Sequence, residues 1–376
     1  EQALLEEQIE LYMANFNLQG LGNSSYPNGV IDIADLPIEI NGVKPKLGWI
    51  YVENNIIKEY ELYFEDIYYL KTKNETYVRN YDSAKLINVK DYGAVGDGVT
   101  DDTVAIKEAV TYLNENGGIL YFPIGTYMVS TTSNGESVIG LNSDKNIEVD
   151  FFKSTIQMQA NEYGNYYVVN VENCTNVEIR NGDLVGDRII HDYVSNPIPN
   201  AGGRGVRAIN NTLCNILNME ISQMTIDAIS TNTYSNGTTN SGTININDCN
   251  LHHCRRMGIT ITDSDIVNVK NTNIQYIGTT DGSEGVARKS GIDIEPHYEN
   301  GTINYVLLDN VNIENITTYG VVNSGRYHEN VVKIDIVDSK IEKLQMSSAA
   351  NIQSSELIDP QNIRKCTMED SYIYKD

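Results

Sequence analysis

The chain has 376 residues, of which 40% are hydrophobic, and no apolar run approaches the roughly 18 residues that a membrane span needs. Its 51 acidic and 27 basic residues give a formal charge of −24, which argues against nucleic acid or an anionic membrane as a partner. The five cysteines are odd in number and lack CxxC spacing, so we expect neither a disulfide framework nor a zinc site.

The first 18 residues predict a short helix, because their apolar residues recur at steps of 4, 3 and 4. These residues are Leu5, Ile9, Tyr12 and Phe16. We interpret residues 1–18 as the end of an oligomeric helical stalk, in which three chains bury this seam together. An ordinary amphipathic helix is the alternative.

Residues 19–85 alternate between polar and apolar side chains and are rich in Tyr. Asn41-Gly42 has the composition of a two-residue hairpin turn. We predict a small β-rich adaptor module, in which no sequence motif indicates a function.

A helix is predicted after Asp102, with Asp101, Asp102 and Thr103 as candidates for its N-cap and first turn. Its apolar stripe is Val104 or Ala105, then Ile106, Ala109, Val110 and Leu113, and Asn116-Gly117-Gly118 ends it. The preceding GAVGDG lacks the strand-to-helix geometry of a phosphate loop, so nucleotide binding is not expected.

An internal repeat follows, in which a polar residue precedes an apolar residue by three positions. The pairs are Asn181/Leu184, Asn218/Ile221, Asp248/Leu251, Asn271/Ile274, Asn310/Ile313, Asp338/Ile341 and Asp370/Ile373. Irregular steps of this size between short β-rich pieces are typical of coils of a right-handed parallel β-helix. We therefore predict an all-β fold, with residues 86–376 forming this solenoid and the helix after Asp102 capping it.

The segment VKDYGAVGDGVTDDTVAI, continued by FPIGTYMVS, resembles the opening of the β-helix in the pectate-lyase-like superfamily. CRRMGITI followed by SGIDIEP looks like a pairing in bacteriophage tailspike and tail-fibre proteins built on that fold. The resemblance covers about Leu86 to Gly325. It implies a capped β-helix, usually a homotrimer, that binds and often cleaves a bacterial surface polysaccharide. It also implies a place in the virion, as part of a phage tail acting outside the host cell, with other tail or baseplate proteins bound through the N-terminus.

Aligning the strand that follows each repeat position predicts a row of outward side chains: Arg207, Ser230, Thr260, Asp293 and Val322. The corresponding inward residues are Val206, Ile229, Ile259, Ile292 and Val321. Thr262 and Glu295 lie one step further along. Because stacked coils are about 4.8 Å apart, we expect the row to form a shallow groove for an extended sugar chain.

Asp293 and Glu295 share one face of a predicted strand, roughly 7 Å apart. Glycoside hydrolysis needs one carboxylic acid and one carboxylate, and this spacing falls near the inverting range. We interpret the pair as catalytic, with Asp227 and Asp263 as weaker candidates. The alternative is a solvated strand face.

Basic residues precede two of these strands: Arg255, Arg256, Arg288 and Lys289. In so acidic a chain they are candidates for binding carboxylate or phosphate groups of a polymer, and salt bridges with neighbouring acids are the alternative. Arg207, Thr260, Thr262 and His297 complete the predicted substrate-binding set. No metal site is predicted.

The leading hypothesis is a phage-type tailspike that hydrolyses a host capsule or wall glycan, teichoic acid included. A non-catalytic, receptor-binding tail fibre that uses the same groove for adhesion is the main alternative. A polysaccharide lyase, for which the resemblance allows Ca²⁺ as a cofactor, is the second. The NTD, DD, GHG and RIK motifs of polygalacturonases are absent, so that activity is not transferred.

Overall fold

A computed structural model describes residues 9–14, 29–33, 36–40, 42–54, 56–64, 67–71, 76–80, 85–195, 202–231, 241–278, 289–323, 326–361, 363 and 366–374. The chain divides into two compact units, Glu1–Leu86 and Ile87–Asp376. Each unit has its own hydrophobic core.

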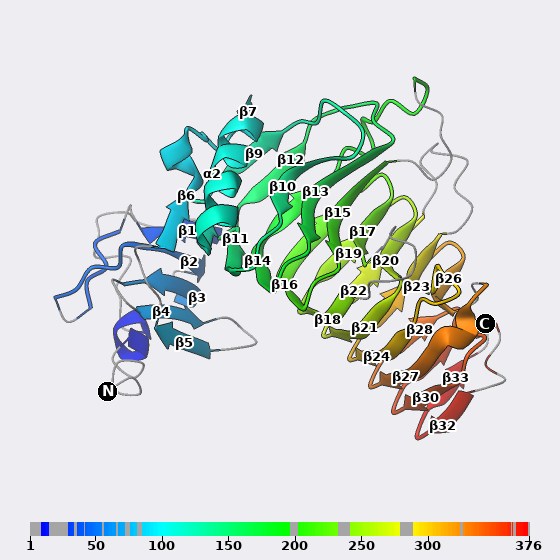
Figure 1. The fold of residues 1–376 in the computed structure, drawn as a ribbon. Helices are drawn as coiled ribbons and strands as arrows, with labels where there is room; N and C mark the ends of the chain where they lie inside the picture. The colour runs from blue at the N-terminus through cyan, green and yellow to red at the C-terminus, as the bar shows by residue number, and fades with distance from the viewer. Residues whose placement is uncertain are drawn as a thin grey trace. The chain divides into compact units, whose positions relative to one another are not determined.

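The small unit is built on an antiparallel sheet whose strands are neighbours in chain order (Figure 1). The strands are β1 (Gly29–Asp32), β2 (Leu47–Glu53), β3 (Ile56–Tyr63), β4 (Ile67–Lys71) and β5 (Thr76–Asn80). Before β2, Ile40 and Val43 exchange backbone hydrogen bonds of 2.9 and 3.0 Å around Gly42, whose φ is +80°. A tight turn therefore contains Gly42, as predicted, whereas Asn41 lies outside the described residues.

Residues 9–14 form a helical segment that packs within the small unit. Ile9 and Met13 are buried in its core, and the Tyr12 hydroxyl accepts a hydrogen bond from the backbone N–H of Glu39 at 3.1 Å. Ile9, predicted to face other chains, is thus already covered by its own chain. Leu5 and Phe16 lie outside the described residues, and the separate stalk over residues 1–18 stays a prediction.

The large unit begins with β6 (Leu86–Asn88), the short 3-10 helix η4 (Val89–Tyr92), β7 (Asp97–Asp101) and the predicted helix, α2 (Thr103–Asn116). The buried face of α2 is Thr103, Ile106, Ala109, Val110 and Leu113, whereas Val104 is 70% exposed. The Asp102 carboxylate does not cap the helix; it accepts backbone N–H bonds from Val95 and Gly96 at 2.6 and 3.0 Å. The backbone N–H groups of Val95 and Gly96 in the glycine-rich turn GAVGDG are therefore already bound to the Asp102 carboxylate.

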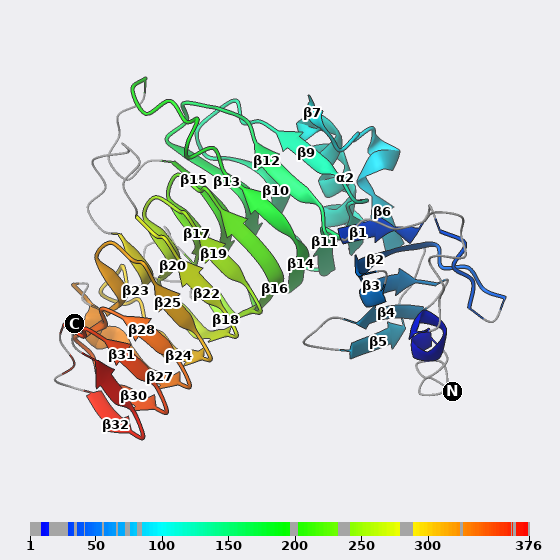
Figure 2. The same ribbon diagram turned by 180° about the vertical axis from the view of Figure 1, so that it is seen from behind.

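The rest of the large unit is a right-handed parallel β-helix. Among the described residues, one of its sheets has eight strands, the first six of which are labelled side by side in Figure 2. They are β10 (Glu136–Leu141), β13 (Asn165–Glu172), β15 (Gly202–Ile209), β17 (Asp227–Ser230), β20 (Met257–Ile261), β23 (Ser290–Ile294), β26 (Tyr319–Asn323) and β29 (Gln345–Met346).

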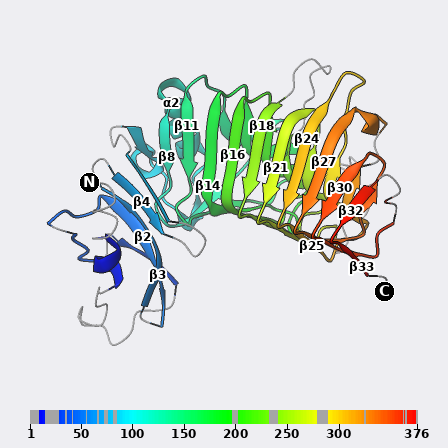
Figure 3. The ribbon, with the colours of Figure 1, turned by 90° about the horizontal axis from the view of Figure 1, so that it is seen from below.

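The other sheet has twenty described strands, part of which form the row in Figure 3. Besides β6 and β7 they are β8 (Gly118–Tyr121), β9 (Thr126–Val129), β11 (Asn146–Asp150), β12 (Thr155–Met158), β14 (Asn176–Val185), β16 (Leu213–Ser222), β18 (Ser241–Asn247), β19 (Asn250–His252), β21 (Ser264–Lys270), β22 (Asn273–Gln275), β24 (Ile303–Asp309), β25 (Asn312–Glu314), β27 (Val331–Val337), β28 (Lys340–Glu342), β30 (Ala350–Gln353), β31 (Glu356–Ile358), β32 (Cys366–Glu369) and β33 (Tyr372–Tyr374). A second 3-10 helix, η5 (His328–Asn330), precedes β27.

The polar residue of every predicted repeat lies at a corner of this sheet with a positive φ, between +47° and +63°. Such φ values favour Asn and Asp, which explains the repeat. Asn218 donates to Asn181, and Asn310 to Asn271, both at 2.9 Å, so the corners are hydrogen-bonded from coil to coil. One coil was missed: Ser354 has φ +48° and lies midway between Asp338 and Asp370.

Inside the coils, the apolar residues of the repeat stack in register from Leu184 to Ile373. Cys174, Cys214, Cys249 and Cys254 are buried and Cys366 is half-buried, and all five are free thiols in the structure. Burial raises the pKa of Cys214, Cys249 and Cys254 to about 12, so these thiols are poor nucleophiles. No helix within the described ranges is long and apolar enough to cross a membrane.

Candidate functional site

The predicted outward row exists. In the eight-stranded sheet, Arg207 pairs with Ser230, Ser230 with Thr260, Thr260 with Asp293 and Asp293 with Val322. The inward residues pair one position earlier, from Val206 to Val321, with the same register. We call these five outward residues the Arg207–Val322 row. The row crosses β15, β17, β20, β23 and β26, which are labelled in Figure 1.

The row is not the open groove that we expected. Ser230 is fully buried, Asp293 is 2% exposed, Thr260 6% and Arg207 9%. The side chains point away from the apolar core, yet they are shielded from solvent. Contact with a bulky ligand is therefore limited to the ends and margins of the row.

One cause of this burial is an ion pair between successive coils. Arg256 donates from Nε and an NH2 group to the two carboxylate oxygens of Asp227, both at 2.8 Å. Thr260 donates its hydroxyl to the same carboxylate at 3.0 Å, and Arg204 Nε lies 3.7 Å from it. Because Asp227 is fully buried and clamped in two-pronged geometry, it positions β17 against β20, and the salt-bridge alternative holds for Arg256.

Two other predicted arginines lie over aromatic rings. The guanidinium carbon of Arg207 is 4.6 Å from the ring centre of Tyr167, and that of Arg255 is 4.5 Å from the ring centre of Tyr193. Arg207 also donates to Asn170 at 3.1 Å. Both arginines are at least 90% shielded, so their charges are held by the protein itself.

Thr262 and Asp263 belong to a buried corner. The Thr262 hydroxyl donates to the backbone oxygen of Thr231 at 3.0 Å, and the Thr262 N–H donates to the Thr231 hydroxyl at 2.9 Å. Asp263 has φ +34° and accepts the backbone N–H of His297 at 3.3 Å. A Cβ at Gly301 would lie 1.8 Å from the Asp263 carboxylate, so a side chain at position 301 would force this carboxylate to move. Both residues are fully buried and support the corner rather than facing a substrate.

The accessible part of the predicted site lies around the ends of β23. Glu295 and Lys289 are half-buried and His297 is exposed. The Glu295 N–H donates to the Ile261 oxygen at 2.9 Å, which holds this residue in the register of the coil before it. Arg288 lies outside the described residues.

A second pair of carboxylates was missed. Asp183 on β14 and Glu220 on β16 are paired in register on neighbouring coils of the twenty-stranded sheet. His252 Nε2 lies 3.1 Å from Glu220, and the His253 ring stacks on Tyr276 at 4.9 Å. Burial, and then the charge of Glu220, raise the pKa of Asp183 to about 6. The signal was in the sequence, because each residue lies two positions after a repeat asparagine, Asn181 or Asn218.

Replacing Asp183 by Asn should stabilise the protein above pH 6. The folded-state pKa of about 6 exceeds the ordinary value of 3.8, so the unfolded chain releases its proton first and wild-type stability falls as pH rises from about 4 to 6. The gain at pH 7.5, discounted for partial exposure, is about 1–2 kcal/mol, and it vanishes near pH 3.5. Urea unfolding of both proteins at the two pH values measures it; equal gains at both would contradict the raised pKa.

Across the described ranges, no three His, Cys, Asp or Glu side chains gather closely enough to hold a metal ion. The family model for "Rhamnogalacturonase A/epimerase, pectate lyase-like" matches residues 86–320. The chain belongs to this family. The match covers α2 and the Arg207–Val322 row except for Val322, its last member.

The chain is also similar to individual proteins. It is 28% identical over 276 residues to the uncharacterized protein YclG of Bacillus subtilis, covering 66% of this chain and 46% of that protein. The chain thus spans less than half the length of this curated relative. The catalytic domain of Agl-KA aligns with a TM-score of 0.54 and 12% identity, over 81% of this chain and 62% of that one.

The tailspike protein gp49 of the Acinetobacter baumannii bacteriophage Fri1, a capsular polysaccharide depolymerase, aligns with a TM-score of 0.51 and 12% identity. The alignment covers 84% of this chain and 63% of gp49. At this identity the two structural likenesses establish a common fold and nothing finer.

Proposed function

We propose that this chain binds a bacterial surface polysaccharide and cleaves it by glycoside hydrolysis, with Glu295 and Asp293 as the acid/base pair. The observation that carries the proposal is their unequal environment: two acids two residues apart, one 2% exposed and the other half-buried. A glycosidase uses its two carboxyl groups in two different roles, and an accessible and a shielded carboxyl group differ in what they can reach.

The two exposures support one division of roles. The general acid must reach the glycosidic oxygen itself, which the half-buried Glu295 can do. The base of an inverting reaction touches only a water molecule, which is small enough to reach the shielded Asp293. Glu295 gives its proton to the leaving oxygen as the C–O bond breaks, and water adds to the anomeric carbon while passing a proton to Asp293.

The likenesses support the biological setting. The fold is shared with gp49, whose name includes capsular polysaccharide depolymerase activity. We extend this to a tailspike in the virion that acts outside the host cell, with other tail or baseplate proteins bound at its N-terminus. Capsule, wall glycan and teichoic acid are the candidate polymers.

A non-catalytic tail fibre is the second candidate, and the shielding of the Arg207–Val322 row favours it. Incubation with capsule and wall polymers from Gram-positive and Gram-negative bacteria separates the functions. Hydrolysis produces new reducing ends and shorter polymer. Unsaturated products that absorb near 230–240 nm would indicate a lyase, and a lyase that uses Ca²⁺ would lose its activity in chelator. Binding of the polymer without any shortening would indicate an adhesion protein.

The homotrimer stays a prediction, and Ile9, which is buried in its own unit, is not free to contribute to a seam between chains. Static light scattering should give about three times the chain mass of 41.9 kDa. A single-chain mass would contradict the trimer.

A further inference from the structure

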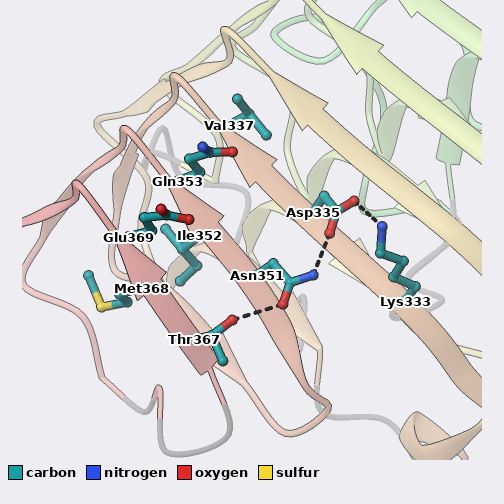
Figure 4. A pocket seen from close by; sticks show the side chains of 9 residues that line it. All are labelled: Lys333, Asp335, Val337, Asn351, Ile352, Gln353, Thr367, Met368 and Glu369. Atoms are coloured by element: carbon teal, nitrogen blue, oxygen red, sulfur yellow. Dashed lines mark hydrogen bonds and ion pairs between the residues drawn. The ribbon is translucent and has the colours of Figure 1, made fainter.

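The last coils of the β-helix carry a cavity of about 560 Å³ on the outer face of the twenty-stranded sheet, away from the strands of the Arg207–Val322 row. It lies between two outward rows of β27, β30 and β32 (Figure 4). Register puts Asp335, Asn351 and Thr367 in the first row and Val337, Gln353 and Glu369 in the second. We call this cavity the C-terminal trough.

The first row is a fixed chain of hydrogen bonds. Thr367 donates its hydroxyl to Asn351 at 2.8 Å, and Asn351 donates to Asp335 at 2.8 Å (Figure 4). Lys333 and the Tyr305 hydroxyl donate to the other oxygen of Asp335 at 2.5 and 2.8 Å. Burial alone would raise the pKa of Asp335, but the bonds from Lys333, Asn351 and Tyr305 outweigh it and hold the pKa below its usual range.

The polar side chains of the second row are available to bind a ligand. Gln353 and Glu369 are exposed, and among the described residues neither side chain has a recorded hydrogen bond or ion pair. An amide and a carboxylate therefore face the trough with their bonding capacity intact, opposite a row whose geometry is already set.

We infer that the C-terminal trough binds a sugar unit that is neutral or carries an amine, and not an acidic one. Planar amide and carboxylate groups on two sides match pairs of neighbouring hydroxyls, and the volume is ordinary for a small-ligand site. Among the described residues that line the trough, Lys333 and Asp335 neutralise each other, so Glu369 leaves one negative charge, which repels uronates and phosphates.

This inference rests on the proposed function only for the class of ligand, since the trough would hold the polymer at a distance from the cleavage site. Polymer cleavage and sugar binding in the trough can therefore be tested separately. Loss of polymer cleavage with intact sugar binding would sink the proposed function and leave the trough, whereas cleavage without sugar binding would do the reverse.

Titration calorimetry of the full chain with three tetrasaccharides tests it: chitotetraose, its deacetylated cationic form and tetragalacturonate. We expect the neutral and cationic probes to bind in the millimolar range and the anionic probe about 10-fold more weakly or worse. Gln353→Ala should weaken both binding probes about 5-fold, and Glu369→Gln should reduce the preference for the cationic over the anionic probe.

Glu356→Gln is the matched control, because Glu356 is an exposed glutamate of β31 outside the trough, and it should change nothing. The inference is overturned if no probe binds up to about 10 mM, if tetragalacturonate binds as tightly as the others, or if the Gln353 and Glu369 variants bind like the control.

Discussion

Replacing Glu295 by Gln should lower polysaccharide turnover by roughly 100-fold or more, because a positioned general acid contributes about that much. Asp293→Asn should have an effect of the same size, since an amide cannot take the proton of the attacking water. Glu295 is half-buried, so the Glu295→Gln variant should unfold within about 1 kcal/mol of wild type. Initial rates of reducing-end release measure the effect.

The control for this pair is the other pair of carboxylates. Asp183→Asn and Glu220→Gln remove the same chemistry from the twenty-stranded sheet and should leave the rate within about 2-fold of wild type. If those variants lose activity while Asp293→Asn and Glu295→Gln cleave at the native rate, the protein is a hydrolase whose site we have placed on the wrong face.

The second large effect concerns stability. Asp227→Asn should cost about 3 kcal/mol, because it leaves the Arg256 guanidinium facing a neutral amide where two charge-assisted bonds of 2.8 Å were made. Arg256→Met should cost as much or more, since the fully buried Asp227 then loses its two-pronged partner. Urea unfolding followed by circular dichroism gives both values.

The double variant Asp227→Asn/Arg256→Met distinguishes this ion pair from unspecific damage. Removing both charges together should cost clearly less than the two single changes added, because neither member of the pair then faces an uncharged partner as an ion. Strictly additive losses, or single losses under about 0.5 kcal/mol, would contradict a clamp between β17 and β20.

The register of the coils was predictable because the corner residues must adopt a positive φ, which restricts them mainly to Asn and Asp. Asn181 and Asn218 mark corners with positive φ, and aligning the strand that follows each such corner placed Thr260 beside Asp293 without any structure. Ser354 escaped because serine is an unusual residue at such a corner, so one coil was hidden in the last interval.

Exposure was not predictable in the same way. The alternation of polar and apolar residues along a strand gives the direction in which Asp293 and Thr262 point. The burial of these side chains depends on partners from other coils, such as Thr231 for Thr262. Arg256 likewise reaches back 29 residues in sequence to Asp227. Such pairings depend on rotamers and corner geometry, which a pattern of apolar and polar letters does not contain.

The pairing of Asp183 with Glu220, in contrast, was predictable from the repeat of corner asparagines. It was missed because only one strand of each coil was aligned. Counting two residues past each corner brings these acids together from coils 37 residues apart, as the register confirms. The elevated pKa of Asp183 then follows from burial beside a like charge, which needs the structure.

The central claim is that the glycan is cut where β23 ends, between Glu295 and Asp293. The most direct test is a crystal structure of the Asp293→Asn/Glu295→Gln double variant with oligosaccharides prepared from a cleaved polymer by mild acid. We predict sugar density over the end of β23, with a glycosidic oxygen beside position 295 and a water molecule at position 293. Density that lies instead across Asp183 and Glu220, or that occupies only the C-terminal trough, would contradict the claim.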